Sequence, residues 1–374
     1  MALKTGSDLR EQVGQLMIMG FEGAVMSARL RRMLATHSPA GVILFKRNIE
    51  EAAQTHTLLR EVQKVAGRAL FRCVDMEGGT VDRFRDAVAR IPSAAEVAAT
   101  GSVEMCRKHG LLIGQQLRAL GFNTDFAPCL DLGLEASRKA LGSRTVSADP
   151  HEVVKYARKF LGGLREARVL GCAKHFPGLG GGPLDSHAAL PVVERTWKQV
   201  WEEDLVPYRE LRREVAFVMV AHVSYPKIVR GGGPASLSRK WIEGVLREKV
   251  GYRGLVVPDD LDMGGVLNGA SIEDAAVRTL EAGSDMFLVC QKEEHVWRAW
   301  EAVVRRGERD RKFASLIAAK ARRVAAFQKK SEEVGARMPA APKAKMVDTL
   351  RRRVWEFTEE LRMSSTFPRE ERAL

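Results

Sequence analysis

The run VLGCAKHF (169–176) is nearly continuous in apolar residues and carries Lys174 and His175 close to its end. A strand that is buried on both faces, as in a parallel sheet, requires a run of this kind. Seven further runs follow the same pattern, and together they predict eight buried strands: LMIMGF (16–21), GVILF (41–45), LFRCVD (70–75), TDFAPCLDL (124–132), AFVMVAHV (216–223), GLVVPDDL (254–261) and DMFLVC (285–290).

The segments between these runs have the spacing of amphipathic helices. In HEVVKYARKFLGGLREA (151–167), the apolar residues Val153, Tyr156, Phe160 and Leu164 recur every three to four positions. Eight strands that alternate with helices predict an α/β fold, a single (β/α)8 barrel of the TIM type. A doubly wound open sheet is the alternative, although no glycine-rich dinucleotide fingerprint opens the first unit.

The barrel is expected to occupy residues 1–330 and to end after the helix FASLIAAKARRVAAFQKK (313–330). Residues 331–374 then form a linker and a C-terminal amphipathic helix. The apolar stripe of this helix consists of Val347, Leu350, Val354, Phe357 and Leu361. Such a stripe predicts a helix that packs against the barrel, with a dimer contact as the alternative. We therefore expect a monomer or a weak dimer.

The 374 residues carry a formal net charge of +13, which favours anionic partners such as sugar acids, phosphates or wall polymers. The basic residues are mostly interleaved with acidic ones, as on solvated helix faces. Aromatic residues make up only 6% of the chain, and no basic module with interleaved aromatics is present. Nucleic acid is therefore not an expected partner.

The five cysteines are odd in number, widely spaced and set in apolar runs, which is typical of reduced, buried thiols. No CxxC pair indicates zinc, and no cluster indicates a required metal or cofactor. The N-terminus carries charges where a signal peptide needs its apolar region, and no apolar run reaches the roughly 18 residues of a membrane helix. We expect a cytoplasmic protein without a membrane partner.

Polar residues stand at the ends of five of the predicted strands. They are Asp75, Asp131, Lys174 with His175, His222, and Asp259 with Asp260. The carboxyl ends of barrel strands converge on one mouth, which is where barrel enzymes build their sites. The sequence therefore predicts a functional site at this mouth.

The stretch AKHFPGLGGGPLDSHAALP (173–191) is rich in glycine and contains Asp185 and His187. On a loop, the carboxylate of Asp185 can accept the imidazole proton of His187 and orient the ring. Such a pairing makes histidine a tunable acid or base near neutral pH. Asp259, just past a buried strand, is placed as a rigidly held nucleophile.

Several separated motifs then resemble those of one known family, in the same order. They are VDMEGGTVDRF (74–84), ALGSRTVSADP (140–150), KHFPGLG (174–180) followed by DSH (185–187), VMVAHVSYP (218–226) with PASLS (234–238), and VVPDDLDM (256–263). Over about residues 10–330 the chain resembles the family 3 glycoside hydrolases. Within that family, it is similar to the single-barrel bacterial β-N-acetylglucosaminidases of peptidoglycan recycling.

The resemblance implies a role for each matching residue. Asp259 would be the nucleophile that forms a covalent glycosyl-enzyme, and His187, oriented by Asp185, would be the acid/base of this retaining reaction. The glycine-rich loop would act as a lid that carries this pair. The positions that grip the hydroxyls of N-acetylglucosamine would be Asp75, Arg83, Arg144, Lys174 and His175. The implied substrate is an N-acetylglucosamine-containing muropeptide.

The sequence also departs from the family pattern and leaves alternatives open. Leu179 stands where the family usually has histidine, Pro258 where serine is common, and Met76 where glutamine is common. A phosphorylase that uses phosphate in place of water is one alternative, because a histidine acid/base does not repel an incoming anion. From another class, an inactive sugar-binding homologue is a second. A β-glucosidase would usually add a second domain, which residues after 330 do not fit.

Overall fold

The computed structural model describes residues 6–182 and 189–364. Its centre is one sheet of eight parallel strands, hydrogen-bonded in the order β7-β6-β5-β4-β3-β2-β1-β8. Each strand falls within one of the eight predicted runs. The strands are β1 (Met17–Met19), β2 (Gly41–Ile43), β3 (Phe71–Val74), β4 (Thr124–Asp125), β5 (Leu170–Phe176), β6 (Phe217–Val220), β7 (Leu255–Pro258) and β8 (Phe287–Val289).

The residues around β7 and β8 close the sheet into a barrel. The Met286 N–H donates to the Val256 carbonyl (3.2 Å), and the Leu261 N–H donates to the Leu288 carbonyl (3.0 Å). Because β8 also pairs with β1, the chain of hydrogen bonds returns to its starting strand. The predicted TIM-type barrel is confirmed, and the doubly wound alternative is wrong.

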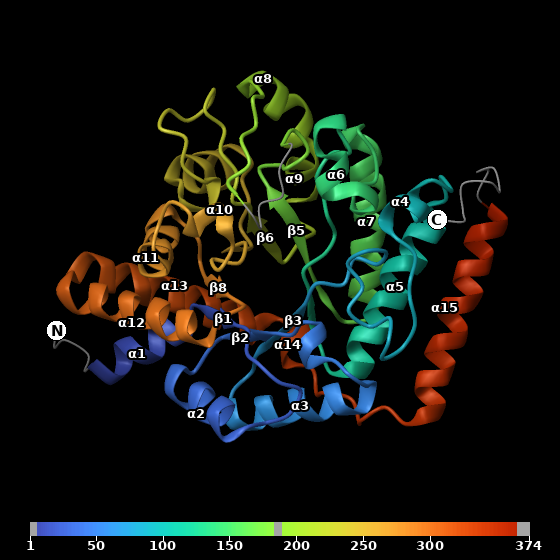
Figure 1. Cartoon of the computed structure of the whole chain (residues 1–374), viewed down its shortest axis with the longest axis horizontal. Coiled ribbons are helices and arrows are strands. Elements are labelled where there is room, and N and C mark those ends of the chain that lie inside the picture. Colours follow the sequence, from blue (N-terminus) through green and yellow to red (C-terminus); the bar gives the residue numbers. More distant parts are fainter. Residues whose placement is uncertain (1–5, 183–188, 365–374) are drawn as a thin grey trace.

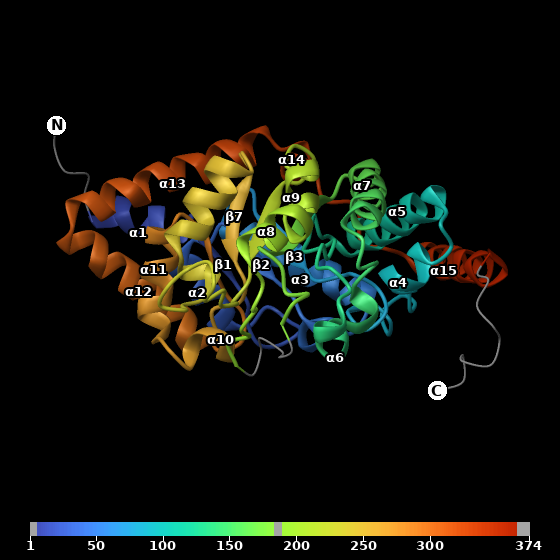
Figure 2. The same cartoon turned by 90° about the horizontal axis from the view of Figure 1, so that it is seen from above.

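Helices surround the strands, as Figures 1 and 2 show. On the first half of the barrel they are α1 (Gly6–Gly14), α2 (Ala28–His37), α3 (Ala52–Ala66), α4 (Ala94–Ala98), α5 (Val103–Leu120), α6 (Arg138–Leu141) and α7 (Pro150–Glu166). On the second half they are α8 (Trp197–Gln199), α9 (Val206–Leu211), α10 (Gly264–Leu267), α11 (Ile272–Ala282), α12 (Glu293–Arg309) and α13 (Arg311–Lys330). Helix α7 matches the helix predicted over 151–167. Its start is set by the side chain of Asp149, which accepts the His151 N–H (2.8 Å), and by Pro150 in the first turn.

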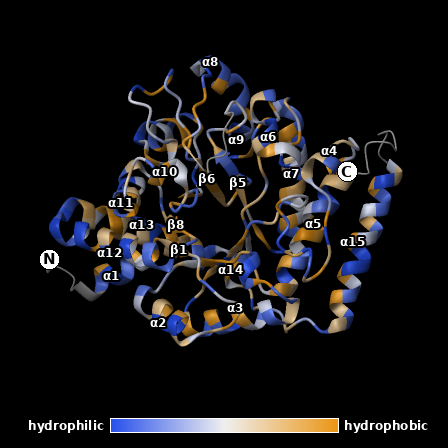
Figure 3. Cartoon of the chain, viewed as in Figure 1, coloured by the Kyte–Doolittle hydropathy of each residue, from blue (hydrophilic) through white to orange (hydrophobic). Residues whose placement is uncertain are grey.

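Apolar side chains fill the barrel and the layer between strands and helices. Figure 3 colours the chain by hydropathy, and hydrophobic residues recur along the central strands. At the amino ends of the strands, Phe71 of β3 and Phe217 of β6 meet edge to face with ring centroids 5.0 Å apart. Phe327 of α13 packs onto both rings. This aromatic cluster closes the barrel at the end opposite the predicted mouth.

The run 124–132 differs from its prediction, because only Thr124–Asp125 is strand. Pro128 has no N–H to give to a ladder. The chain nevertheless continues beside β5, where the Leu130 N–H donates to the Lys174 carbonyl (2.6 Å). This course carries Asp131 alongside the end of β5.

After α14 (Glu332–Gly335), helix α15 (Ala344–Ser364) runs along the outside of α5, where Figure 1 draws it in red. Phe357 stacks on His109 of α5 with centroids 5.9 Å apart, and Lys108 pairs with Glu360 (2.8 Å). The apolar stripe of α15 thus faces the barrel helices. None of the helices in the described ranges is long and apolar enough to cross a membrane.

Candidate active site

A cavity of about 240 Å³ opens at the carboxyl ends of the strands. Three of the predicted site residues line it together: Asp75 after β3, Arg83, and Asp259 after β7. Asp260, Asp262 and Gln291 add polar groups, and the apolar lining comes from Ile43, Phe45, Phe126, Met219, Met263, Leu288 and Cys290. A small cavity of mixed lining with converging polar groups is the usual form of a small-molecule site.

Lys174, near the end of β5, connects this cavity to buried charges. Its Nζ lies 2.6 Å from Oδ1 of Asp75 and 2.7 Å from Oε1 of Glu77, and its side chain is only 2% exposed. Burial lowers the pKa of Lys174, but the two carboxylates outweigh burial and raise this pKa above its ordinary value. Lys174 is therefore a permanent cation that fixes the carboxylate of Asp75.

Arg144 holds the other side of Glu77 with two parallel hydrogen bonds. Its Nε and Nη2 each donate to a Glu77 oxygen at 2.9 Å. Burial raises the pKa of Glu77, but Arg144 and Lys174 outweigh it and hold this pKa well below its usual range. Glu77 belongs to the motif VDMEGGTVDRF (74–84), but the sequence alone predicts no role for it. Its place between two cations makes it the centre of the network.

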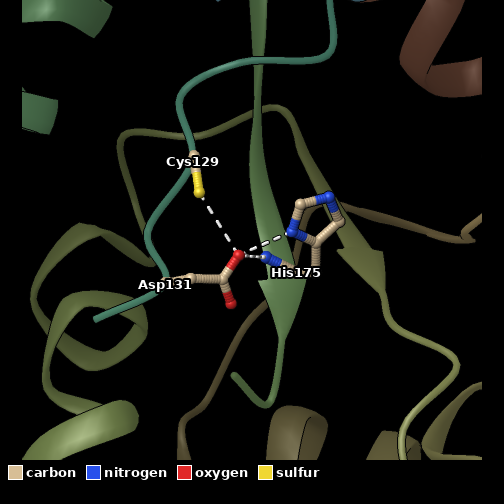
Figure 4. A group of neighbouring side chains, drawn as sticks. All are labelled: Cys129, Asp131 and His175. Atoms are coloured by element: carbon tan, nitrogen blue, oxygen red, sulfur yellow. Dashed lines mark hydrogen bonds and ion pairs between the residues drawn. The ribbon is translucent and has the colours of Figure 1, made fainter. Parts of the chain in front are cut away.

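His175 follows Lys174 but has different partners, of which Figure 4 shows Asp131. Its Nδ1 lies 2.6 Å from Oδ2 of Asp131, and its Nε2 lies 3.3 Å from Nη2 of Arg144. Burial raises the pKa of Asp131, but the contact with His175 outweighs burial and lowers it. The structure therefore brings Asp75, Lys174, Arg144 and His175 into one connected network.

Asp259 is held by its own turn at the end of β7. Its N–H donates to the Val220 carbonyl (2.9 Å), and its Oδ1 accepts the N–H of Asp260 (2.9 Å). Burial raises the pKa of Asp259, but His175, His222 and the hydrogen bond from Asp260 outweigh burial and lower it below its ordinary value. An ionised carboxylate that faces a cavity is suited to nucleophilic attack.

Asp260 faces the same cavity but has the opposite electrostatic behaviour. Its Oδ1 accepts the N–H groups of Asp262 and Cys290, each at 3.0 Å. Burial, followed by repulsion from Asp262, raises the pKa of Asp260 to about 7. Two adjacent carboxyl groups thus differ in charge below neutral pH, with Asp259 as the ionised one.

Asp185 and His187 lie outside the described residues. The glycines before them are described up to Gly182, and they are closely packed. A Cβ at Gly180 would lie 2.4 Å from the carbonyl oxygen of Leu132, and one at Gly181 would lie 2.8 Å from Cγ1 of Val193. Close approach of the backbone therefore explains these two glycines, beside the lid role that the sequence suggested.

Cys129, Asp131 and His175 form one group of possible metal-ligand side chains in the described part of the chain, and all three are buried. Their approach is explained by hydrogen bonds, because Oδ2 of Asp131 lies 3.2 Å from the Cys129 sulfur as well as 2.6 Å from His175. The guanidinium of Arg144 beside the ring disfavours a cation. We therefore interpret this group as a hydrogen-bond network.

Comparison with known proteins shows the family of the chain. The protein-family model for the glycosyl hydrolase family 3 N-terminal domain matches residues 8–327 of the sequence. The chain belongs to glycosyl hydrolase family 3. It is a glycosidase, and residues of two motifs that carry the resemblance, 74–84 and 256–263, line the cavity.

Curated relatives and solved structures from this family are similar over most of the chain. A β-hexosaminidase from Idiomarina loihiensis is 36% identical over 282 residues, which is 74% of this chain and 84% of the relative. The structure of a family 3 β-N-acetylglucosaminidase from Paenibacillus sp. FPU-7 superposes with a TM-score of 0.89 at 32% identity, and covers 97% of this chain and 69% of that one. Native NagZ from Neisseria gonorrhoeae gives 0.70 at 28% identity, over 82% and 97% of the two chains.

Proposed function

We propose that the chain is a retaining β-N-acetylhexosaminidase that removes non-reducing terminal β-linked N-acetylglucosamine from peptidoglycan fragments. The observation that carries the proposal is the ionised Asp259 in a small cavity shared with Asp75 and Arg83. The names of the relatives, β-hexosaminidase and β-N-acetylglucosaminidase, support this sugar as the substrate.

In the first step, a carboxylate oxygen of Asp259 attacks the anomeric carbon, and the bond to the leaving oxygen breaks. His187, oriented by Asp185, gives its proton to that oxygen. In the second step, His187 takes a proton from water, and the water oxygen displaces Asp259 from the anomeric carbon. Two displacements restore the β configuration. The low pKa of Asp259 supports its role as nucleophile and leaving group.

The remaining predicted residues would bind the sugar hydroxyls. Asp75 is available at the cavity wall, and Lys174 fixes its orientation. Arg83 lines the cavity, and its Nε is buried without a hydrogen-bond partner in the described structure. A buried donor without a partner has a free-energy cost that a substrate oxygen would remove. Arg144 and His175 would complete the grip through the network around Glu77.

The wider assignment follows from the same proposal. The net charge of +13 suits muropeptides that carry lactyl and peptide carboxylates. We propose a cytoplasmic enzyme that acts as a monomer or weak dimer, with residues 1–330 as the catalytic unit and residues 331–374 as an accessory linker and helix. No cofactor enters the proposed reaction.

The test is hydrolysis of a chromogenic β-N-acetylglucosaminide by the wild type, Asp259→Ala and His187→Ala. We expect turnover by the wild type and a loss of at least about 100-fold in each variant, because each removes a group that reacts directly. The assay is repeated with added phosphate and with the matching β-glucoside. Turnover that depends on phosphate would make the enzyme a phosphorylase, and an inert wild type under all conditions would contradict the proposal.

A further inference from the structure

Asp131 is a buried carboxylate that the proposed reaction does not use directly. It lies in the segment that follows β4 and is 1% exposed. Burying a carboxylate costs free energy unless hydrogen-bond donors surround it. The donors around Asp131 therefore show what this residue is built to hold.

Four donors converge on the two oxygens of Asp131. Oδ2 lies 2.6 Å from Nδ1 of His175 and accepts the His175 backbone N–H (3.2 Å) and the Cys129 thiol (3.2 Å). Oδ1 accepts the backbone N–H of Leu179 (2.6 Å). Burial raises the pKa of the Cys129 thiol well above its ordinary value, so the thiol stays protonated and donates. One carboxylate thus joins β5, the segment after β4 and the start of the glycine-rich stretch.

The contact with Asp131 also decides which nitrogen of His175 carries the proton. A carboxylate only accepts hydrogen bonds, so Nδ1 must be the donor. In the neutral ring Nε2 is then an acceptor, and Nη2 of Arg144 lies 3.3 Å from it. The two contacts agree, because the guanidinium can only donate. A single tautomer satisfies both neighbours.

We propose that Asp131 is a positioning residue of this glycosidase, which fixes the tautomer and direction of His175, while the Leu179 N–H holds the other oxygen of its carboxylate. The chain of contacts runs from Asp131 through His175 to Arg144, and from there through Glu77 to Lys174. This inference rests on the proposed function only in that His175 binds the sugar. The Cys129 thiol contacts the same oxygen of Asp131 as the ring of His175 does, as Figure 4 shows.

The first test is a double-mutant cycle with Asp131→Asn, His175→Ala and the combined variant. If Asp131 acts through His175, Asp131→Asn lowers kcat/KM by about 10- to 100-fold, as expected when a binding group is misdirected. The combined variant should then lie within about 2-fold of His175→Ala alone. Losses that multiply in the combined variant would show two independent roles and would overturn the proposal.

The second test does not depend on turnover. With ¹⁵N-labelled histidine, the two nitrogen resonances of His175, assigned by their absence in His175→Ala, report which nitrogen carries the proton. We expect the proton on Nδ1 in the wild type and a shift of both resonances in Asp131→Asn. Unchanged resonances in the variant would overturn the inference even if the enzyme is active. An inert enzyme with the expected resonances would refute only the proposed function.

Two controls separate positioning from general stability. Cys129→Val removes the thiol donor, whereas Cys129→Ser keeps a donor, so Cys129→Val should lower kcat/KM more than Cys129→Ser does. Asp285→Asn removes another buried carboxylate, which lies before β8 at the opposite end of the barrel. It should leave the His175 resonances as in the wild type. Changes there equal to those of Asp131→Asn would indicate a general loss of structure and would contradict a specific role.

Discussion

At the carboxyl ends of the strands, Lys174 and Arg144 share Glu77 beside an open cavity. At the amino ends, Arg247 and Arg323 share Asp285. Both networks join two cations through one buried carboxylate.

The two networks differ in whether their polar groups bond to the backbone or remain available at the cavity. Asp285 also accepts the Val256 N–H (2.8 Å), and Arg247 also donates to the Gly254 carbonyl (2.8 Å). The groups of the amino-end network, here called the lower network, are therefore used in contacts with the backbone and join neighbouring strand ends. The network at the carboxyl ends is called the upper network. The upper network fixes Asp75 at a cavity wall, near an Arg83 whose Nε has no partner in the described structure. Similar ion pairs hold the fold at one end and prepare a binding site at the other.

The largest effect is expected from Asp259→Asn, which keeps the size of the side chain and removes the nucleophile. We expect kcat to fall by about 1,000-fold or more, because the covalent step is lost. Thermal unfolding should change little by comparison. A variant with more than a tenth of wild-type kcat would place the nucleophile elsewhere.

Glu77→Gln tests whether the upper network serves binding. The amide cannot neutralise Lys174 and Arg144, so both cations lose their fixed direction. We expect kcat/KM to fall by about 10- to 100-fold, mainly through KM. Steady-state kinetics with the chromogenic substrate measures this split. Unaltered kinetics together with a lower melting temperature would make the upper network structural, like the lower one.

Asp285→Asn is the matched change at the other end. Breaking one partner of a buried ion pair should reduce the free energy of unfolding by about 3 kcal/mol. We expect kcat/KM of the folded protein to stay within about 3-fold of wild type, since the amino-end face of a barrel serves stability. Denaturant unfolding and kinetics on one preparation give both values. Lost activity with normal stability would contradict the division between the two ends.

The smallest effect concerns pH and Asp260. The pKa of Asp260 is raised from 3.8 to about 7 in the folded protein, mainly by burial. Between those values the folded state holds a proton that the unfolded state lacks, so this group's contribution to stability falls as pH rises from about 4 to 7.

In Asp260→Asn the side chain at position 260 is neutral at every pH, so the variant should not lose this contribution to stability as the pH rises. We expect its melting temperature, relative to wild type, to be higher at pH 8 than at pH 5 by about 2–5 °C. Scans of both proteins at the two pH values measure the difference. An equal difference at both values would mean that Asp260 does not titrate in this range.

The strands could be predicted from the sequence because a strand that is buried on both faces requires a nearly continuous apolar run. The run 124–132 was predicted too long, since Pro128 and the residues after it lie beside β5 without forming a ladder. The sequence also predicts that Asp75, Lys174 and Asp259 lie at one mouth, because the carboxyl ends of parallel strands converge in a closed barrel.

The pairings inside the site could not be predicted in the same way. Glu77 and Arg144 are 67 positions apart, and no periodicity indicates that they meet. Asp131 was placed at the mouth by its position after a strand, but its four donors depend on how the segments after β4 and β5 approach each other. Such contacts are set by three-dimensional packing rather than by local pattern.

The central claim, that Asp259 attacks the sugar, is tested most directly by trapping the glycosyl-enzyme. His187→Ala is mixed with an N-acetylglucosaminide whose activated leaving group needs no protonation, and the quenched protein is digested and analysed by mass spectrometry. We predict one N-acetylhexosamine adduct on the peptide that contains Asp259, and none in Asp259→Asn. An adduct on another residue would contradict the account, as would rapid turnover by Asp259→Asn.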